Sequence, residues 1–450
     1  VTRGPMAWAA SMYAAEKGKA RKLATVRSKT LAVLDRAIVR TVSLLTSPKI
    51  AYFLGEPFFT LFGFRKRRPR FDLGEVGSVL VVRPDEIGDV VLTTPFLREL
   101  RGNLPSAWIT LVVKPDVVNL VELCPHVNEV LPYDWAVAER FRPLWRHLRA
   151  SRLAVTRLFR RHFDLAVLPR WDADYYHGAF LAYFSGAWWR VGYSHEVTEE
   201  KKLLNMGWDI LLTEALYDLS VRHEVERNLD LITSLGGQVR NDSLELWIGP
   251  EDERWAEDIL EKCGINSSQM LIGLGVGAGA AKRMWPLSNF VRLGEWLKRE
   301  YGARILVIGG YGEERLGEHV KGVLGQCVIN AVGLTTLRQS AALMRRCVLF
   351  VGNDAAPVHM AAAVGVPVIQ ISCHPSNGRS LHYNSPDRFR PWGVPHVVVR
   401  PYYAVAPCTD ACAASEPHCI AAVTTRQVQE AVGTLLALKT LSDVGKVMPS

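Results

Sequence analysis

The stretch of this 450-residue sequence that could carry chemistry most directly lies between an apolar run and a predicted helix. Residues 78–82 are apolar and valine-rich and predict a buried strand, and 96–101 predict a helix. The turn between them lies at the carboxyl edge of an α/β sheet, where ligands bind. We expect Asp89 to open the helix and face that crevice, with Gly88 allowing a geometry that a side chain would hinder. Other polar residues in and after this turn are Asp85, Thr93 and Thr94.

A glycine-rich segment with two cations, 275–286, follows a second predicted strand at 270–275 and leads into a helix. Glycines such as Gly277 let backbone amides approach a phosphate, and a helix N-terminus favours anions. Lys282 and Arg283 add full positive charge. A flexible loop with solvated charges is the alternative, which the strand-loop-helix order disfavours.

A third segment, 351–363, again joins an apolar strand to a helix, and this helix is rich in small residues. Asp354 in its turn could accept hydrogen bonds from ligand hydroxyls, and His359 follows within the first helical turns. A lone histidine is more often structural, but its place in this cluster favours a functional role. Together the three segments describe a site for a phosphorylated, hydroxyl-rich ligand, which suits group transfer from a nucleotide-sugar donor.

The elements that must position these residues alternate between strand and helix from residue 77 onward. Strands are predicted at 78–83, 107–113, 128–132, 164–168, 189–193, 270–275, 303–309, 347–352 and 366–372. This alternation predicts an α/β fold with two doubly wound, Rossmann-like domains. We expect an N-terminal extension at 1–76, an acceptor domain at 77–245 and a donor domain at 246–450, whose last helix packs back on the acceptor domain. A ligand bound by both domains would lie in the cleft between them.

The net charge of +9 is concentrated in the N-terminal extension. Residues 1–74 contain 15 Lys and Arg against 4 Asp and Glu, so the rest of the chain is close to neutral. Apolar residues at helical spacing in 31–45 and the aromatic block 58–64 predict a basic arm that binds an anionic membrane surface. A solvated helix packed on its own domain is the alternative, and a nucleic-acid-binding body is disfavoured.

The three segments together resemble the motifs of glycosyltransferase family 9, the heptosyltransferases of the lipopolysaccharide inner core. The matching patterns are Asp-x-Ile-Gly-Asp-x-Val-Leu-Thr-Thr-Pro, Lys-Arg-x-Trp-Pro and Gly-Asn-Asp-x-x-Pro-x-His-x-Ala-Ala. Their order and separation match the family's, and the resemblance covers 77 to about 435. It implies a GT-B fold and an inverting, metal-independent transfer without a cofactor, from a donor such as ADP-heptose to a glycan or glycolipid hydroxyl.

The resemblance also implies a role for individual residues. Asp89 is the expected general base, with Asp85 in reserve, and Thr93 and Thr94 are acceptor-side candidates. On the donor side, a basic residue before Trp-Pro contacts phosphate, and both Lys282 and Arg283 qualify. The remaining expected donor-binding residues are Gly277, Asp354, which binds the transferred sugar, Ala355, Ala356 and His359. The alanine pair departs from the Ser-Gly or Thr-Gly that family members commonly have, which bears on the donor more than on the fold.

Several other features bound the function. The 8 cysteines are sparse and no run spans a membrane, so we expect a cytoplasmic protein, peripheral on the inner membrane. The irregular spacing of Cys408, Cys412, His418 and Cys419 does not predict a metal site. A dinucleotide-dependent oxidoreductase, suggested by Gly275, Gly277 and Ala280, is one alternative function. A non-catalytic nucleotide-sugar or glycan-binding protein is another.

Overall fold

The structure is a computed structural model that describes residues 46–61, 71–136, 142–266 and 269–447. The predicted helical pattern at 31–45 and most of the basic arm lie outside these ranges. By packing, the chain divides into two compact units. One holds the described parts of 1–71 with 134–219, and the other holds 72–133 with 220–450. The domain boundaries at 76 and 245 stay predictions.

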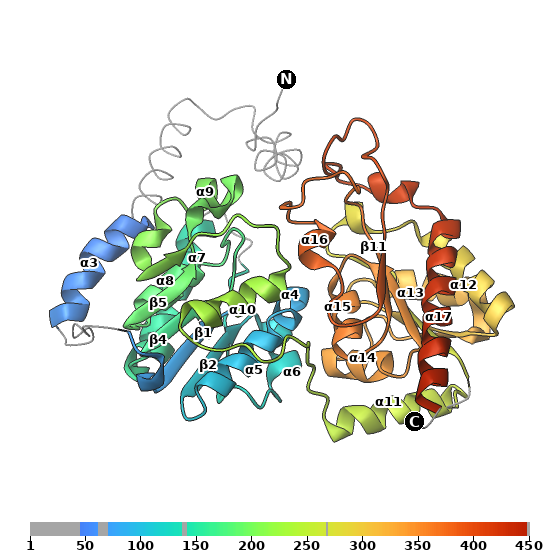
Figure 1. The fold of residues 1–450 in the computed structure, drawn as a ribbon, viewed down its shortest axis with the longest axis horizontal. Coiled ribbons are helices and arrows are strands. Elements are labelled where there is room, and N and C mark those ends of the chain that lie inside the picture. The colour runs from blue at the N-terminus through green and yellow to red at the C-terminus, as the bar shows by residue number, and fades with distance from the viewer. Residues whose placement is uncertain (1–45, 62–70, 137–141, 267–268, 448–450) are drawn as a thin grey trace, which may run out of the picture. The chain divides into compact units, whose positions relative to one another are not determined.

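The first six strands form one sheet, in the order β3-β2-β1-β4-β5-β6 (Figure 1). They are β1 (Ser78–Val82), β2 (Trp108–Val113), β3 (Glu129–Pro132), β4 (Leu165–Leu168), β5 (Trp189–Tyr193) and β6 (Glu214–Leu216). The pairs β1–β2, β2–β3, β4–β5 and β5–β6 are parallel. The accompanying helices are α3 (Pro48–Leu61), α4 (Ile87–Val91), α5 (Thr94–Asn103), α6 (Val118–Val121), α7 (Arg142–Leu153), α8 (Gly178–Phe184), α9 (Glu199–Leu204) and α10 (Glu224–Ser234).

The last six strands form a second parallel sheet, in the order β12-β11-β10-β7-β8-β9. They are β7 (Leu271–Gly275), β8 (Arg304–Ile308), β9 (Val328–Asn330), β10 (Leu349–Asn353), β11 (Val368–Ile371) and β12 (His396–Val399). The helices are α11 (Pro250–Lys262), α12 (Leu287–Tyr301), α13 (Glu314–Leu324), α14 (Leu337–Met344), α15 (Ala356–Ala363), α16 (Pro386–Phe389) and α17 (Thr425–Val447). The two parallel sheets confirm the predicted α/β, doubly wound fold.

All nine predicted strands are present, with ends within two residues of the prediction. The short strands β6, β9 and β12 were not predicted. Buried residues of α12, α13 and α17 share one apolar core with the second sheet. The last helix therefore packs on this sheet, and its expected return to the N-terminal domain stays a prediction. None of the described helices is long and apolar enough to cross a membrane.

Candidate functional site

Asp89 lies in the first turn of α4, directly beyond the carboxyl end of β1. The N-cap residue of this helix is Glu86, and Asp89 is the third helical residue. Its side chain is 26% exposed and its Oδ1 lies 3.8 Å from Nη2 of the buried Arg83. The carboxylate is thus held from one side and remains open to a ligand from the other.

The surroundings of Asp89 make it a better base near neutral pH than an ordinary aspartate. Burial raises the pKa of Asp89 to about 6, against the lowering effect of the Arg83 guanidinium. The carboxylates of Glu224 and Glu86 raise this pKa further, and the guanidinium of Arg388 lowers it. A base whose pKa lies close to the working pH combines a deprotonated form with adequate proton affinity.

The two threonines after Asp89 are buried and have structural partners. Thr93 Oγ1 donates to the Asp89 carbonyl oxygen at 2.8 Å and accepts from Arg83 Nε at 3.0 Å. Thr94 Oγ1 donates to the Val91 carbonyl oxygen at 2.8 Å. Their contact with an acceptor stays a prediction, and in this structure they fix the junction between α4 and α5. Asp85 is also buried, with Oδ2 3.4 Å from Arg83 Nη1.

Gly88 brings α4 against the start of α15. A Cβ placed on Gly88 would lie 3.0 Å from Cδ2 of His359 and 3.6 Å from Cα of Ala356. Gly88 is helical and has no positive φ, so its value is close approach and not the special turn geometry that we expected. Asp89 follows Gly88 directly in the chain, so this contact also brings Asp89 near the segment that follows Asp354.

Arg283 brings positive charge to Asp354 and His359. Burial raises the pKa of the Asp354 carboxyl, and the Arg283 charge opposes this rise. Burial lowers the pKa of His359 to about 4, and the same guanidinium lowers it further. His359 is therefore neutral at pH 7, and its Nδ1 has no hydrogen-bond partner among the described residues. This nitrogen is also buried, so the predicted contact of His359 with a donor stays a prediction.

The two cations before Trp285 have different surroundings. Lys282 Nζ donates to Tyr383 Oη at 2.8 Å and to the Cys412 carbonyl oxygen at 3.2 Å, so it is tethered on the protein side. The partly exposed guanidinium of Arg283 makes no hydrogen bond to any residue that the structure describes. Of the two predicted phosphate ligands, Arg283 is therefore the one whose N–H groups are not used by another described residue.

Asn353 joins the two donor-side segments, a role that the sequence reasoning missed. Its Nδ2 donates to the carbonyl oxygens of Val276 and Gly277, at 2.9 and 3.2 Å. Its Oδ1 accepts from the Trp285 amide at 2.9 Å. This fully buried amide at the end of β10 therefore fixes both ends of the glycine-rich loop relative to Asp354. The Gly-Asn-Asp pattern was a signal for it.

Glu313 is a second residue that the sequence reasoning missed. A Cβ on Gly277 would overlap the Glu313 carboxylate, so the two lie against one another across the loop. Glu313 Oε2 accepts from the Gly310 amide at 2.7 Å, which fixes it just beyond the end of β8. A carboxylate at this edge of a doubly wound sheet typically binds ribose hydroxyls. The three glycines and two glutamates of 309–314 could have indicated it.

A buried ion pair links α10 to α16 near Asp89. Arg388 donates from Nε and Nη2 to Oε1 of Glu224 at 2.9 and 2.7 Å, and both residues are almost fully buried. Because the two charges act on Asp89 with opposite sign, the pair leaves its pKa dominated by burial. These residues are 164 positions apart, and neither belongs to a motif that pointed to the site.

Ala355 and Ala356 stand at the start of α15, with Ala355 as the N-cap residue. The first amides of a helix have no partner within it and favour an anion. Both alanines are partly exposed. The geometry is compatible with the predicted donor contacts, which stay predictions.

The family model "Glycosyltransferase family 9 (heptosyltransferase)" matches residues 154–416. Lipopolysaccharide heptosyltransferase 2 of Salmonella typhimurium is 24% identical over 310 residues, covering 65% of this chain and 82% of the relative. Lipopolysaccharide heptosyltransferase 3 of Escherichia coli is 23% identical over 300 residues, with coverage of 63% and 80%.

Solved structures agree on the fold. A glycosyltransferase family 9 protein of Veillonella parvula matches with a TM-score of 0.64 at 20% identity, over 82% of this chain and 99% of that one. The structure of E. coli ADP-heptose lps heptosyltransferase II matches with a TM-score of 0.60 at 20% identity, over 81% and 99%. The predicted GT-B fold is therefore confirmed.

The family match decides between the three functional classes that the sequence left open. It extends over more than half of the chain, and the curated relatives are named as transferases. The oxidoreductase and the non-catalytic binding protein are accordingly set aside in favour of an enzyme. The chain belongs to glycosyltransferase family 9, and it is a glycosyltransferase of the heptosyltransferase type.

Proposed function

We propose that this protein transfers a heptose from ADP-heptose to a hydroxyl of a lipopolysaccharide core or a related glycan, with inversion. The relatives named as heptosyltransferases support the sugar, and their acceptors are named as lipopolysaccharide or lipooligosaccharide. The solved structure of E. coli heptosyltransferase WaaC with ADP shares the fold, with a TM-score of 0.56.

The observation that carries this proposal is the close approach of Gly88 to His359. It sets the helix of the proposed base against the helix that follows the proposed sugar-binding carboxylate, Asp354. A displacement at the anomeric carbon needs a base on one side of the sugar and diphosphate binding on the other. Proximity of these groups removes much of the entropic cost of assembling the reaction.

In the proposed step, an acceptor hydroxyl oxygen attacks the anomeric carbon while Asp89 takes its proton. The bond from that carbon to the diphosphate oxygen breaks, and both of its electrons leave with ADP. Arg283 and the open amides at the start of α15 would stabilise the growing negative charge, as an oxyanion-binding site does. Asp354 would accept hydrogen bonds from the sugar, and Glu313 from the ribose.

Two measurements test the proposal. ADP-heptose, ADP-glucose, UDP-glucose and GDP-mannose are screened for thermal stabilisation of the purified protein. The donor that stabilises best is then incubated with core oligosaccharides that end in different inner-core sugars, and products are identified by mass spectrometry and by the anomeric coupling in NMR spectra. We expect ADP-heptose to be preferred and the new linkage to be inverted. Preference for a UDP sugar, or a retained anomer, would overturn the assignment.

We also propose that the enzyme works in the cytoplasm, peripherally on an anionic membrane surface through the basic extension and α3. Four apolar side chains of α3 are strongly exposed, although the opposite side of the helix is packed. They are Phe53, Leu54, Phe58 and Leu61, which are 45–81% exposed. Exposed apolar side chains beside basic residues are typical of segments that insert at a lipid headgroup layer.

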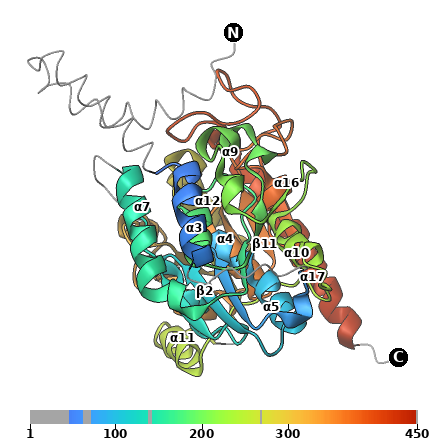
Figure 2. The same ribbon diagram turned by 90° about the vertical axis from the view of Figure 1, so that its left-hand side faces the viewer.

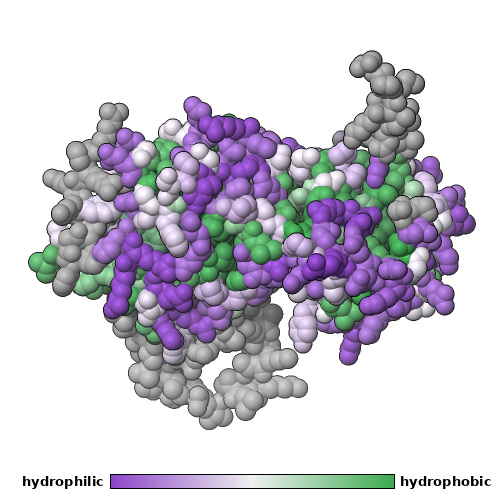
Figure 3. All heavy atoms as spheres, turned by 90° about the horizontal axis from the view of Figure 1, so that it is seen from below, coloured by the Kyte–Doolittle hydropathy of each residue, from purple (hydrophilic) through white to green (hydrophobic). Residues whose placement is uncertain are grey.

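The packed side of α3 holds the helix firmly in its own unit. Phe59 is buried and contacts the rings of Phe159 and Tyr183, at centroid distances of 5.9 and 5.4 Å. A side chain on Gly55 would overlap Tyr183, so this glycine permits the close packing. Figure 2 draws α3 in front, facing the viewer, and Figure 3 shows apolar residues at the edge where Figure 1 draws α3. The exposed side chains are therefore presented by an anchored helix.

A further inference from the structure

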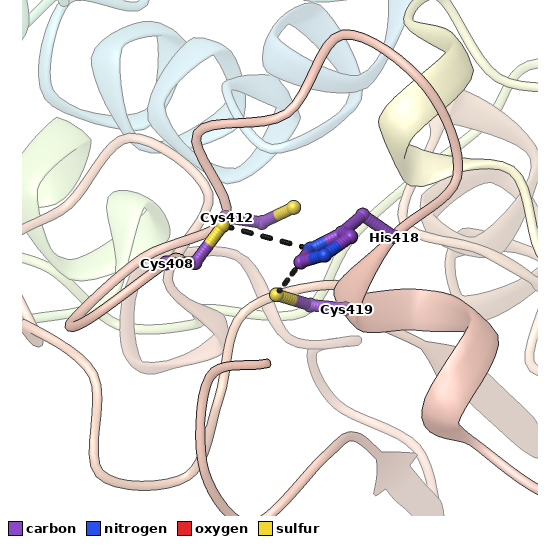
Figure 4. A group of neighbouring side chains, drawn as sticks. All are labelled: Cys408, Cys412, His418 and Cys419. Atoms are coloured by element: carbon purple, nitrogen blue, oxygen red, sulfur yellow. Dashed lines mark hydrogen bonds between the residues drawn. The ribbon is translucent and has the colours of Figure 1, made fainter. Parts of the chain in front are cut away.

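Four metal-ligand side chains converge in the loop between β12 and α17. Cys408, Cys412, His418 and Cys419 each offer one ligand atom, and these atoms all lie within 4.8 Å of one another. Figure 4 shows the side chains pointing toward a common centre from a single loop. The spacing of the four residues in the sequence predicted no site, because it gives no indication of how the loop folds back on itself.

The distances suit a tetrahedral transition metal ion. Zinc about 2.3 Å from sulfur and about 2.0–2.1 Å from nitrogen holds a sulfur and a nitrogen about 3.5 Å apart in a tetrahedron. His418 Nδ1 lies 3.6 Å from Cys408 Sγ and 3.5 Å from Cys419 Sγ. The Ala413 amide donates to Cys408 Sγ at 3.4 Å, which is the kind of outer contact that stabilises a metal-bound thiolate.

We propose that these three cysteines and His418 bind one structural zinc ion. Three thiolates and an imidazole are a preferred zinc ligand set, and four protein ligands leave no open position for catalysis. Cys412 and Cys419 are almost fully buried in the core of the second sheet, while Cys408 and His418 are partly exposed. An ion could therefore enter from the Cys408 side.

The loop that the ion would fix supports the donor-side cations. The carbonyl oxygen of Cys412 accepts from Lys282 Nζ, and η9 (Cys419–Ala422) packs on η7 (Ala281–Arg283). Just after η9, the Val423 carbonyl oxygen accepts from Trp285 Nε1 at 2.8 Å. Zinc would thus hold the turn that carries Lys282 and Arg283 in place. This positioning role depends on the proposed phosphate binding, whereas the metal site itself does not.

Metal analysis of the full chain tests the site. Protein purified without a chelator and without a metal-affinity step should contain about one zinc per chain. Replacement by cobalt should give the visible absorption of a tetrahedral ion and thiolate-to-metal bands in the near ultraviolet. Zinc-free, folded protein would overturn the proposal, as would a disulfide between two of these cysteines. Stoichiometric iron would retain the site and overturn the choice of zinc.

Variants separate the site from general effects on folding. We expect Cys408→Ser and His418→Ala to lose most of the metal, and His418→Cys to retain it with an added thiolate band. Cys263→Ser, at a partly exposed cysteine after α11, is the matched control and should retain zinc. If Cys408→Ser and His418→Ala both fail to fold, the cobalt spectrum of His418→Cys still tests whether residue 418 is a metal ligand. A spectrum identical to that of the wild type would contradict ligation by residue 418.

Removal of the ion tests the link to the donor side. Zinc-stripped protein should bind ADP at least tenfold more weakly, by calorimetry, and recover when zinc is restored. Unchanged ADP affinity would overturn the positioning role and leave the metal site standing. Metal content is measured without any transferase assay, so its result is independent of whether ADP-heptose proves to be the donor.

Discussion

Gly88 and His359 are so close that a single methyl group on the glycine would lie 3.0 Å from Cδ2 of the imidazole ring. These residues come from the first and third motifs and are more than 250 positions apart. The contact explains why a glycine stands next to the proposed base, since its φ would accept any residue. The packing of α4 against α15 can therefore be tested by a substitution at Gly88.

Gly88→Ala should lower kcat/KM by roughly tenfold or more with little loss of stability. The new Cβ has to push the ring away by a few tenths of an ångström, and small displacements of reacting groups are costly. Steady-state kinetics and a thermal melt check it. Gly322→Ala is the matched control, because it lies in α13 with open space around it and should be neutral or slightly stabilising. Equal kinetics for the two variants would contradict the role of the contact.

The elements were largely predictable because buried parallel strands are short apolar runs bounded by turns, as for β1 and β7. Each motif could also be placed at the end of its strand. What could not be predicted is how residues far apart in the chain meet. Glu313 reaches Gly277 and Glu224 reaches Arg388 through folding of the whole unit, and no local periodicity records such pairs. The burial of Thr93 and Thr94 was missed for the same reason.

Arg283→Ala should weaken ADP binding by about 10–100-fold, the range expected for losing one charge-assisted hydrogen bond. Calorimetry with ADP measures it, and Arg283→Lys should restore part of the affinity. Lys282→Met should instead lower thermal stability as well, because Lys282 hydrogen-bonds to Tyr383 and to the Cys412 carbonyl oxygen. A larger loss of ADP affinity in Lys282→Met than in Arg283→Ala would reverse the assignment of the two cations.

Gly277→Ala should weaken donor binding through Glu313. The added methyl group displaces the carboxylate, which then loses its hydrogen bond from the Gly310 amide. If displacement of Glu313 is the whole effect, Glu313→Ala and the double variant should bind ADP about as weakly as Gly277→Ala. A double-mutant cycle measures this coupling, and additive losses would show that the two residues act separately.

Replacing Phe53, Leu54 and Leu61 together by serine should weaken binding to anionic vesicles at least tenfold, because each loses apolar area that the bilayer could bury. Flotation with phosphatidylglycerol-containing vesicles measures it, at two salt concentrations. The α3 variant should retain the salt sensitivity that the basic extension provides. Val323→Ser in α13, which removes one apolar side chain that is 52% exposed, serves as control. Unchanged flotation of the triple variant would exclude α3 from the membrane surface.

Asp89→Asn should abolish most of the turnover while making the protein more stable at neutral pH. Loss of a general base typically costs about 10²–10⁴-fold, and the amide leaves the donor-side contacts intact. In the wild type, kcat/KM should rise as pH increases through about 6, since only the deprotonated carboxylate can accept the acceptor's proton. Glu86→Gln should move this limb to lower pH, because Glu86 raises the pKa of Asp89.

The stability change has a definite sign and pH range. The pKa of Asp89 is raised on folding from 3.8 to about 6, so the folded state holds the proton more tightly than the unfolded state. Ionisation of Asp89 therefore lowers the free energy of unfolding. This loss grows as the pH rises from 3.8 to 6 and remains in full above pH 6. Melting curves of Asp89→Asn and the wild type should differ at pH 8 and converge near pH 3.5. A less stable amide variant at pH 8 would contradict the raised pKa of Asp89. A flat pH–rate profile across pH 6 would mean that the proton is accepted elsewhere, with Asp85→Asn as the next variant to measure.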